Sequence, residues 1–122
     1  MEEPVHRMLN AMEPGTFIPP HRHMNPDKQE IYIVLRGSLV AVEFDEEGAI
    51  LQKVVLGPES GRYGLEIPAR TWHSLAVLEP GTVIYEIKEG PFAPVVPENI
   101  APWAPDPDDQ ESVAAFMEQM TA

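Results

Sequence analysis

Short apolar segments alternate with turn residues along most of the chain, and this pattern predicts β-strands. The segments are rich in Val, Ile, Leu and aromatic residues, and Gly, Pro, Asn and Asp separate them. Strands are expected at residues 16–23, 30–35, 38–44, 49–56, 65–67, 72–78 and 82–88. Such short strands at nearly regular spacing, with no helices between them, indicate an all-β sandwich or closed barrel.

The chain changes character after about Glu89, where prolines and acidic residues replace the apolar segments. We therefore predict a β-barrel carrying the functional site over residues 1–92. Residues 93–122 are predicted to form a Pro-rich acidic tail that ends in a short amphipathic helix. This helix is expected to pack on the barrel or on a second subunit.

The predicted C-terminal helix has a recognisable start and one apolar face. Asp106 is expected to cap it, and Pro107 suits its first position. Apolar residues recur at the spacing of one helix face, at Val113, Phe116, Met117 and Met120.

The segment at 30–35 is apolar on both of its predicted faces. Tyr32 and Val34 share a face with Glu30, whereas the residues between them are Ile31 and Ile33. A strand that faces water on one side alternates apolar and polar residues. A second sheet, the tail or another subunit should therefore cover the outer face, and we expect a homodimer.

The composition limits the classes of partner. The chain has 122 residues and a formal net charge of −12, so its surface repels phosphate backbones and anionic membranes but attracts cations. There are no cysteines, and no apolar run has the length of a membrane span. The start of the chain, with Glu2 and Glu3, does not resemble a signal peptide. We expect a cytoplasmic protein that binds neither nucleic acid nor membranes.

Three of the four histidines and one glutamate suggest a metal site. His21 and His23 are two residues apart, which places both imidazoles on one face of an extended segment. Glu30 begins the next strand, and a carboxylate inside a β-domain is costly unless it is paired or binds a cation. His73 joins them only if the barrel brings its strand alongside. His6 has no such neighbours and is interpreted as a surface or structural residue.

The spacing of these residues resembles the first cupin motif, G-x5-H-x-H-x(3,4)-E-x6-G. Gly15, His21, His23, Glu30 and Gly37 match it, with two extra residues before the glutamate. The second cupin motif, G-x5-P-x-G-x2-H-x3-N, is matched only at Pro68 and His73. Arg70 stands where glycine is usual, and we expect a different turn geometry there.

Within the cupins, the chain is similar to the WbuC family of metalloproteins. The similarity covers residues 7–92 and includes Arg7-Met8-Leu9-Asn10, Trp72-His73-Ser74 and Lys88-Glu89-Gly90-Pro91-Phe92. It implies a single jelly-roll β-barrel with one metal held by His21, His23, Glu30 and His73. Because members occur among polysaccharide biosynthesis genes, it also implies a sugar or sugar-nucleotide ligand.

Three imidazoles and one carboxylate suit a divalent transition metal, namely Fe, Mn, Ni, Co or Zn. Tyr32 and Glu86 are candidate catalytic residues: Tyr32 shares a face with Glu30, and Glu86 is a general base if it points inward. Two classes of function stay open. One is an enzyme, either an isomerase or epimerase or a small-molecule dioxygenase, and the other is a non-catalytic ligand-binding module.

Overall fold

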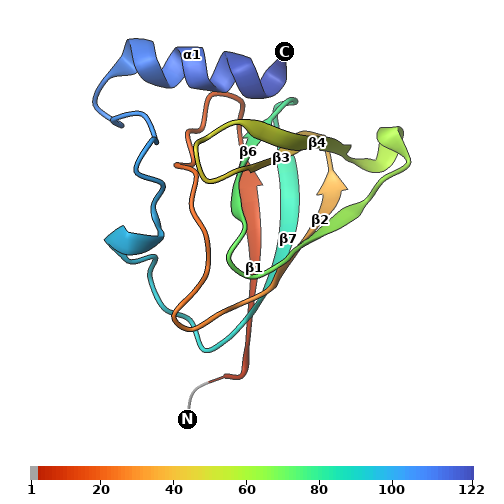
Figure 1. Cartoon of the computed structure of the whole chain (residues 1–122). Coiled ribbons are helices and arrows are strands. Elements are labelled where there is room, and N and C mark those ends of the chain that lie inside the picture. Colours follow the sequence, from red (N-terminus) through yellow and green to blue (C-terminus); the bar gives the residue numbers. More distant parts are fainter. Residues whose placement is uncertain (1–2) are drawn as a thin grey trace.

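The protein is built from two antiparallel sheets. The computed structural model describes residues 3–122, so Met1 and Glu2, which bear on the expected lack of a signal peptide, lie outside the described residues. The strands are β1 (Val5–Met12), β2 (Glu30–Arg36), β3 (Leu39–Phe44), β4 (Ile50–Leu56), β5 (Gly64–Ile67), β6 (Trp72–Val77) and β7 (Thr82–Glu89). They form a four-stranded sheet in the order β1-β7-β2-β5 and a three-stranded sheet in the order β4-β3-β6 (Figure 1).

Three helical segments complete the chain. Two short 3-10 helices, η1 (Pro58–Ser60) and η2 (Pro97–Asn99), lie in the connections, and α1 (Gln110–Thr121) ends the chain. No helix within residues 3–122 is long and apolar enough to span a membrane. The all-β class with one C-terminal helix, expected from the sequence, is confirmed.

The first strand differs from the prediction. The expected strand at 16–23 is wrong: this segment has no regular structure except for an isolated bridge at His21. Pro19 and Pro20 lack the N–H groups that a strand ladder needs. The actual first strand, β1, pairs with β7 over its whole length. Because β1 carries polar residues on both faces, its sequence does not show the alternation of apolar and polar residues by which strands are predicted.

The main core lies between the two sheets. The four-stranded sheet contributes Tyr32, Val34, Ile67 and Ile84, and the other sheet contributes Leu39, Ala41, Leu56, Leu75 and Val77. Each of these side chains is at most 4% exposed. Their burial removes apolar surface from water, which is the main force that holds the sheets together.

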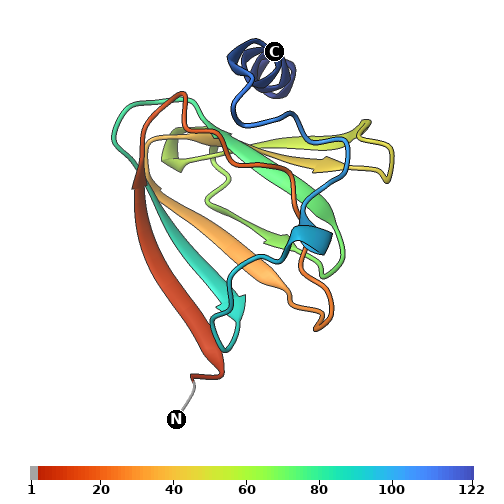
Figure 2. The ribbon, with the colours of Figure 1, turned by 90° about the vertical axis from the view of Figure 1, so that its left-hand side faces the viewer.

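The outer face of the three-stranded sheet is covered by the tail and the helix. A second apolar cluster there contains Val40, Val42, Phe44, Trp72, Ala76, Ala101 and Met120, with Phe116 and Met117 packed against it. Figure 2 shows α1 end-on above this sheet. The predicted apolar helix face is confirmed, although the division into residues 1–92 and 93–122 stays a prediction.

The helix starts later than predicted. Its N-cap is Asp109, whose carboxylate accepts hydrogen bonds from the Ser112 N–H at 3.2 Å and from the Ser112 hydroxyl at 2.8 Å. Asp106 instead accepts the Asp108 N–H at 2.9 Å and so closes a turn before the helix. Of the three aspartates at positions 106, 108 and 109, the one followed three residues later by a serine is the cap.

The outer face of the four-stranded sheet is exposed. Leu9 pairs with Tyr85 and Tyr85 pairs with Ile33, so apolar side chains form a row across three strands. Leu9 is 64% exposed and Leu35 is 55% exposed. Figure 2 shows β1, β7 and β2 side by side, with no other described segment over them. The homodimer therefore stays a prediction.

Candidate metal centre

A short backbone bridge brings the distant histidines together. The His21 N–H donates to the His73 carbonyl at 3.0 Å, and the His73 N–H donates to the His21 carbonyl at 2.9 Å. The two residues therefore lie directly opposite each other, and their rings are 4.4 Å apart between centroids. This reciprocal pair fulfils the requirement that the strand with His73 lie beside the first two histidines.

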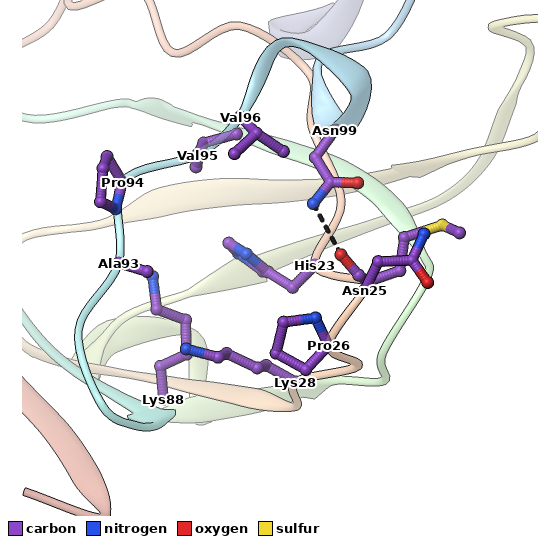
Figure 3. A pocket seen from close by; sticks show the side chains of 11 residues that line it. His23, Asn25, Pro26, Lys28, Lys88, Ala93, Pro94, Val95, Val96 and Asn99 are labelled. Carbon is purple, nitrogen blue, oxygen red and sulfur yellow. Dashed lines mark hydrogen bonds between the residues drawn. The ribbon is translucent and has the colours of Figure 1, made fainter.

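The tail holds the histidine segment from its other side. The Arg22 N–H donates to the Asn99 carbonyl at 2.9 Å, and the Ala101 N–H donates to the Pro20 carbonyl at 3.0 Å. The Asn99 amide also donates to the Met24 carbonyl at 2.9 Å, drawn as a dashed line in Figure 3. The segment that carries His21 and His23 is thus enclosed between β6 and residues 99–101.

Four potential ligand atoms converge at one point. Each of His21, His23, Glu30 and His73 offers one atom, and these atoms all lie within 4.8 Å of one another. Glu30 is 2% exposed, His73 is 1% exposed and His23 is 9% exposed. His6 lies elsewhere, with its ring 4.9 Å from that of Phe92. The structure therefore brings together the four residues that the sequence selected and leaves out the fourth histidine.

Two of the imidazoles are oriented in the same way. The Nδ1 atom of His21 lies 2.8 Å from the Pro19 carbonyl, and that of His73 lies 2.8 Å from the Thr71 carbonyl. Each Nδ1–H donates to the carbonyl two residues earlier, so each Nε2 faces the cluster. A metal-binding histidine commonly uses its second nitrogen in this manner, which fixes its tautomer and ring orientation.

Glu30 lies at the centre of the cluster. Its Oε1 atom accepts the Tyr32 hydroxyl at 2.7 Å and lies 2.7 Å from His73 Nε2. Burial by itself raises the pKa of Glu30, but its contacts with His23, His73 and Tyr32 outweigh burial and lower this pKa well below its ordinary value. The group is therefore a carboxylate at neutral pH.

The histidine at position 21 is neutral at neutral pH. Burial and the charges of His73 and His23 lower the pKa of His21 to about 3, against the hydrogen bond to Pro19 and the carboxylate of Glu30. An imidazole must be deprotonated to bind a metal. The protein thus keeps this nitrogen available without competition from protons.

A divalent cation fits this arrangement. His23 Nε2 is buried and has no hydrogen-bond partner in residues 3–122, and it lies 3.5 Å from Glu30 Oε1. Both ring nitrogens of His73 face oxygen atoms, so its Nε2 carries either a proton or a cation. A cation among the four ligand atoms satisfies the lone pair of His23 and the charge of Glu30 together.

The residue between the two histidines points to the other side of the segment. The Arg22 guanidinium lies 4.1 Å from the centroid of the Trp72 ring and 3.5 Å from the Glu46 carboxylate. Cation–π stacking of this kind fixes the side chain and, with it, the backbone of the segment. Arg22 therefore positions both neighbouring imidazoles.

The turn before His73 differs from the geometry predicted for it. Arg70 has a φ of 69°, the left-handed conformation that the usual glycine favours, so the expected change of turn geometry is wrong. Its N–H donates to the His23 carbonyl at 3.1 Å, and its guanidinium lies 2.7 Å from Asp27. These contacts hold a non-glycine residue in the turn that leads to His73.

A cavity of about 270 Å³ opens beside the cluster. The inward faces of β1 and β7 line it with Asn10, Met12, Ile84, Glu86 and Lys88, and the tail contributes Val95. Both candidate catalytic residues, Tyr32 and Glu86, are part of this lining. Lys88 was not among the predicted site residues, although its spacing of two from Glu86 places both side chains on one face of the strand.

The two candidate catalytic residues differ in protonation. Burial and the charges of Glu30 and Glu86 raise the pKa of Tyr32 well above its ordinary value, so it stays a hydrogen-bond donor. Burial and the Glu30 charge raise the pKa of Glu86, while Lys88 and His73 act in the opposite direction. Of the two, Glu86 is therefore the better candidate for a general base, because a raised pKa makes a carboxylate a stronger base.

Comparisons with known proteins identify the fold. KdgF from Halomonas sp. has a TM-score of 0.59 at 21% identity, over 76% of this chain and 74% of that chain. The WlaRB TDP-quinovose 3,4-ketoisomerase from Campylobacter jejuni has a TM-score of 0.60 at 17% identity, over 93% and 73%. Oxalate decarboxylase from Bacillus subtilis has a TM-score of 0.59 at 20% identity, over 75% and 22%. The chain has the cupin fold.

Sequence comparison is less informative. Residues 1–56 match a family described only as a domain of unknown function, DUF6016, and no curated protein matches the chain. The similar structures share the fold at identities too low to transfer an activity, and the two whose names describe a reaction, a decarboxylase and a ketoisomerase, differ in that reaction. The function of this chain must therefore be argued from its site.

Proposed function

We propose that this chain is a metal-binding cupin of the WbuC type that binds, or acts on, a small sugar-like molecule at a centre of three histidines and one glutamate. His21, His23, Glu30 and His73 hold one divalent transition metal per chain, of the series Fe, Mn, Ni, Co and Zn. The observation that carries the proposal is the convergence of their four ligand atoms within 4.8 Å. A cytoplasmic location belongs to the same proposal.

The residues around the centre have distinct roles. Tyr32 donates to Glu30 Oε1 and keeps this carboxylate in place. The Nδ1–H groups of His21 and His73 keep their rings oriented. A bound metal supplies Lewis-acid polarisation of a substrate oxygen, or a site for dioxygen or water.

Metal analysis tests the proposal directly. Protein loaded with each metal and then dialysed is expected to retain close to one ion per chain by elemental analysis. His21→Ala and His73→Ala should each lose most of this metal because each removes one ligand, whereas His6→Ala should retain it. Circular dichroism confirms that the variants are folded. Metal-free protein from several preparations, or equal loss in all three variants, contradicts the assignment.

An enzyme of the isomerase or epimerase class is favoured by one observation. Glu86 lines the cavity beside the cluster, is half-buried and has a raised pKa, which suits a group that removes and returns a proton. Dioxygenase activity and metal-dependent binding without catalysis are the alternatives, and no comparable observation favours them.

Proton exchange separates these alternatives. Sugars and sugar nucleotides that carry a carbonyl group are incubated with the metal-loaded protein in D2O and followed by NMR. The enzyme should exchange the hydrogen next to the carbonyl, and Glu86→Gln should abolish exchange while retaining the metal. The control Glu79→Gln, at an exposed turn residue, should leave exchange unchanged. If no carbonyl sugar exchanges, the isomerase or epimerase class is wrong, and the dioxygenase and binding-module alternatives stand.

A further inference from the structure

The inner face of β7 carries a buried lysine that has no partner. Lys88 is 9% exposed, and no described residue forms a hydrogen bond or ion pair with its ammonium group. Lys88 lies opposite Glu30 in the strand register, but the Glu30 Oε1 atom contacts Tyr32 and His73 and not the lysine. The enclosed polar atoms without a partner among the described residues are Arg22 Nε and His23 Nε2. The Lys88 ammonium group is therefore accessible from the pockets that Lys88 lines, where it is free to bind an anion.

A second, smaller pocket adjoins this lysine. It has a volume of about 120 Å³ and shares His23, Lys88 and Val95 with the cavity beside the metal centre. In Figure 3, Lys88 and Lys28 enter the pocket from the side opposite Pro94, Val95 and Val96. A molecule whose anionic group occupies this pocket can extend past His23 toward the four converging ligand atoms.

The donors in this pocket suit a carboxylate better than a phosphate. Lys88 is free, Lys28 already gives one hydrogen to the Pro91 carbonyl at 2.6 Å, and the Asn99 amide donates to Met24. Most of the remaining lining is apolar, at Met24, Pro26, Ala93, Pro94, Val95 and Val96. Arginines, which can contact two phosphate oxygens at once, and helix N-termini commonly bind phosphate groups in proteins. This pocket has no arginine, and the only helix start in its lining is Val96, the N-cap of the three-residue 3-10 helix η2.

With a metal bound, the charged groups around the cavity would carry a net positive charge, which favours one anionic group there. The chain as a whole carries a net charge of −12, but the cavity holds Lys88 and, in the proposed function, a divalent cation beside Glu30. These positive charges outweigh the carboxylates of Glu30 and Glu86 when the metal is bound. Salt screens charges inside the pocket less than it screens charges on the acidic outer surface. The charges that line the pocket therefore decide whether an anion binds there.

We propose that this pocket binds the carboxylate of a small sugar acid through the ammonium groups of Lys88 and Lys28, with its hydroxyl groups directed toward the metal centre. The inference rests on the proposed function and narrows its ligand to a polyhydroxylated carboxylate. Lys88 makes the main contact because its side chain is largely buried and its ammonium group has no partner among the described residues. Lys28, which is bonded to Pro91, contributes less.

The test uses sugars that differ only at the terminal carbon. D-glucuronate, D-glucose and D-glucose 6-phosphate, together with the matching galactose series, are titrated into metal-loaded and metal-free protein by calorimetry. In the metal-loaded protein at least one uronate should bind about tenfold or more tightly than its neutral and phosphorylated counterparts. Equal affinities for a uronate and its neutral sugar, or preference for a 6-phosphate, overturn the inference.

Lysine-to-methionine variants give the matched control. Lys88→Met keeps an unbranched apolar chain and should abolish the preference for uronates, whereas Lys53→Met, which lies on β4 and bonds the C-terminal carbonyls at Gln119 and Ala122, should keep it. Lys88→Met should also melt at the same or a higher temperature without ligand, because the ammonium group that it removes makes no hydrogen bond or ion pair with the described residues. Unchanged uronate affinity, or a lowered melting temperature, means that Lys88 has a structural role and contradicts the proposal.

The two proposals fail in different ways. If the protein binds metal but no uronate, the carboxylate pocket is wrong and the metal centre stands. If the protein binds no metal but uronates still bind in a manner that needs Lys88, the metal centre is wrong and the pocket stands.

Discussion

In the cluster of candidate metal ligands, burial disfavours charged side chains, while contacts between neighbouring groups stabilise one of the charges. Glu30 is almost fully buried and still a carboxylate, because Tyr32 and two imidazoles surround its Oε1 atom. His21 is neutral because burial and neighbouring imidazoles disfavour a further positive charge. This arrangement keeps the Glu30 carboxylate and the His21 imidazole free of protons, which is the form in which both bind a metal.

The depressed pKa of His21 predicts acid sensitivity of the metal-free protein. In the unfolded chain His21 has an ordinary pKa near 6.5, whereas in the folded protein it is about 3. Between these values the unfolded state binds a proton that the folded state does not. The contribution of His21 to the free energy of unfolding is therefore fully present above about pH 6.5 and is lost as the pH decreases toward 3. The melting temperature of metal-free protein should therefore fall across this range.

Two asparagine variants isolate this effect. His21→Asn removes the titrating group, so its melting temperature should depend less on pH than that of the wild type. His6→Asn should keep the wild-type dependence, because no comparable burial acts on an imidazole outside the cluster. Identical slopes for wild type and His21→Asn refute the explanation.

At the scale of elements, the connection that ends β2 passes so close to β7 that it requires a glycine. Gly37 follows β2 with a φ of 81°, and a Cβ atom added there would lie 2.3 Å from Thr82 Oγ1 and 2.9 Å from Thr82 Cα. The connection from β2 to β3 thus passes against the start of β7. Only glycine combines the left-handed conformation with this close approach.

Alanine substitutions at two glycines should separate these two requirements. Gly81 has a φ of 71° but open space around it, so Gly81→Ala should cost only the conformational strain, about 1 kcal/mol. Gly37→Ala should cost roughly 3 kcal/mol or more, because backbone atoms at Thr82 must also move. Urea denaturation measures both values, and similar losses for the two variants contradict the steric argument.

At the scale of the whole molecule, the two sheets are covered unequally. The tail and α1 bury the outer face of the sheet β4-β3-β6. The outer face of the sheet β1-β7-β2-β5 keeps Leu9, Ile31 and Leu35 exposed by at least a third. Apolar rows that cross several strands are typical of surfaces that associate. The homodimer predicted from the sequence would use this face.

Two leucines with nearly equal exposure test the dimer. Leu9 is 64% exposed on β1 and Leu51 is 66% exposed on β4. Light scattering should find a dimer for the wild type and for Leu51→Asp, and a monomer for Leu9→Asp, because a charge on the apolar face is not compensated in the interface. A monomeric wild type, or a dimeric Leu9→Asp, rejects this interface.

Much of the fold and the candidate centre could be predicted from the order of residues. Period-2 patterns located most strands, and the i, i+3, i+4 pattern located the helix face, because both reflect local geometry. The pair His21 and His23, with Glu30 on the next strand, was visible for the same reason. The spacing before His73 was recognised only through its resemblance to the second cupin motif.

Non-local contacts decided the rest. β1 is a strand because β7 supplies its partners, not because its own sequence alternates strongly. The place of His73 opposite His21, the role of Asn99 beside Arg22 and the unpaired Lys88 all depend on segments far apart in the chain. Sequence patterns record which face a residue prefers, but the packing of sheets and tail determines which residues meet on that face.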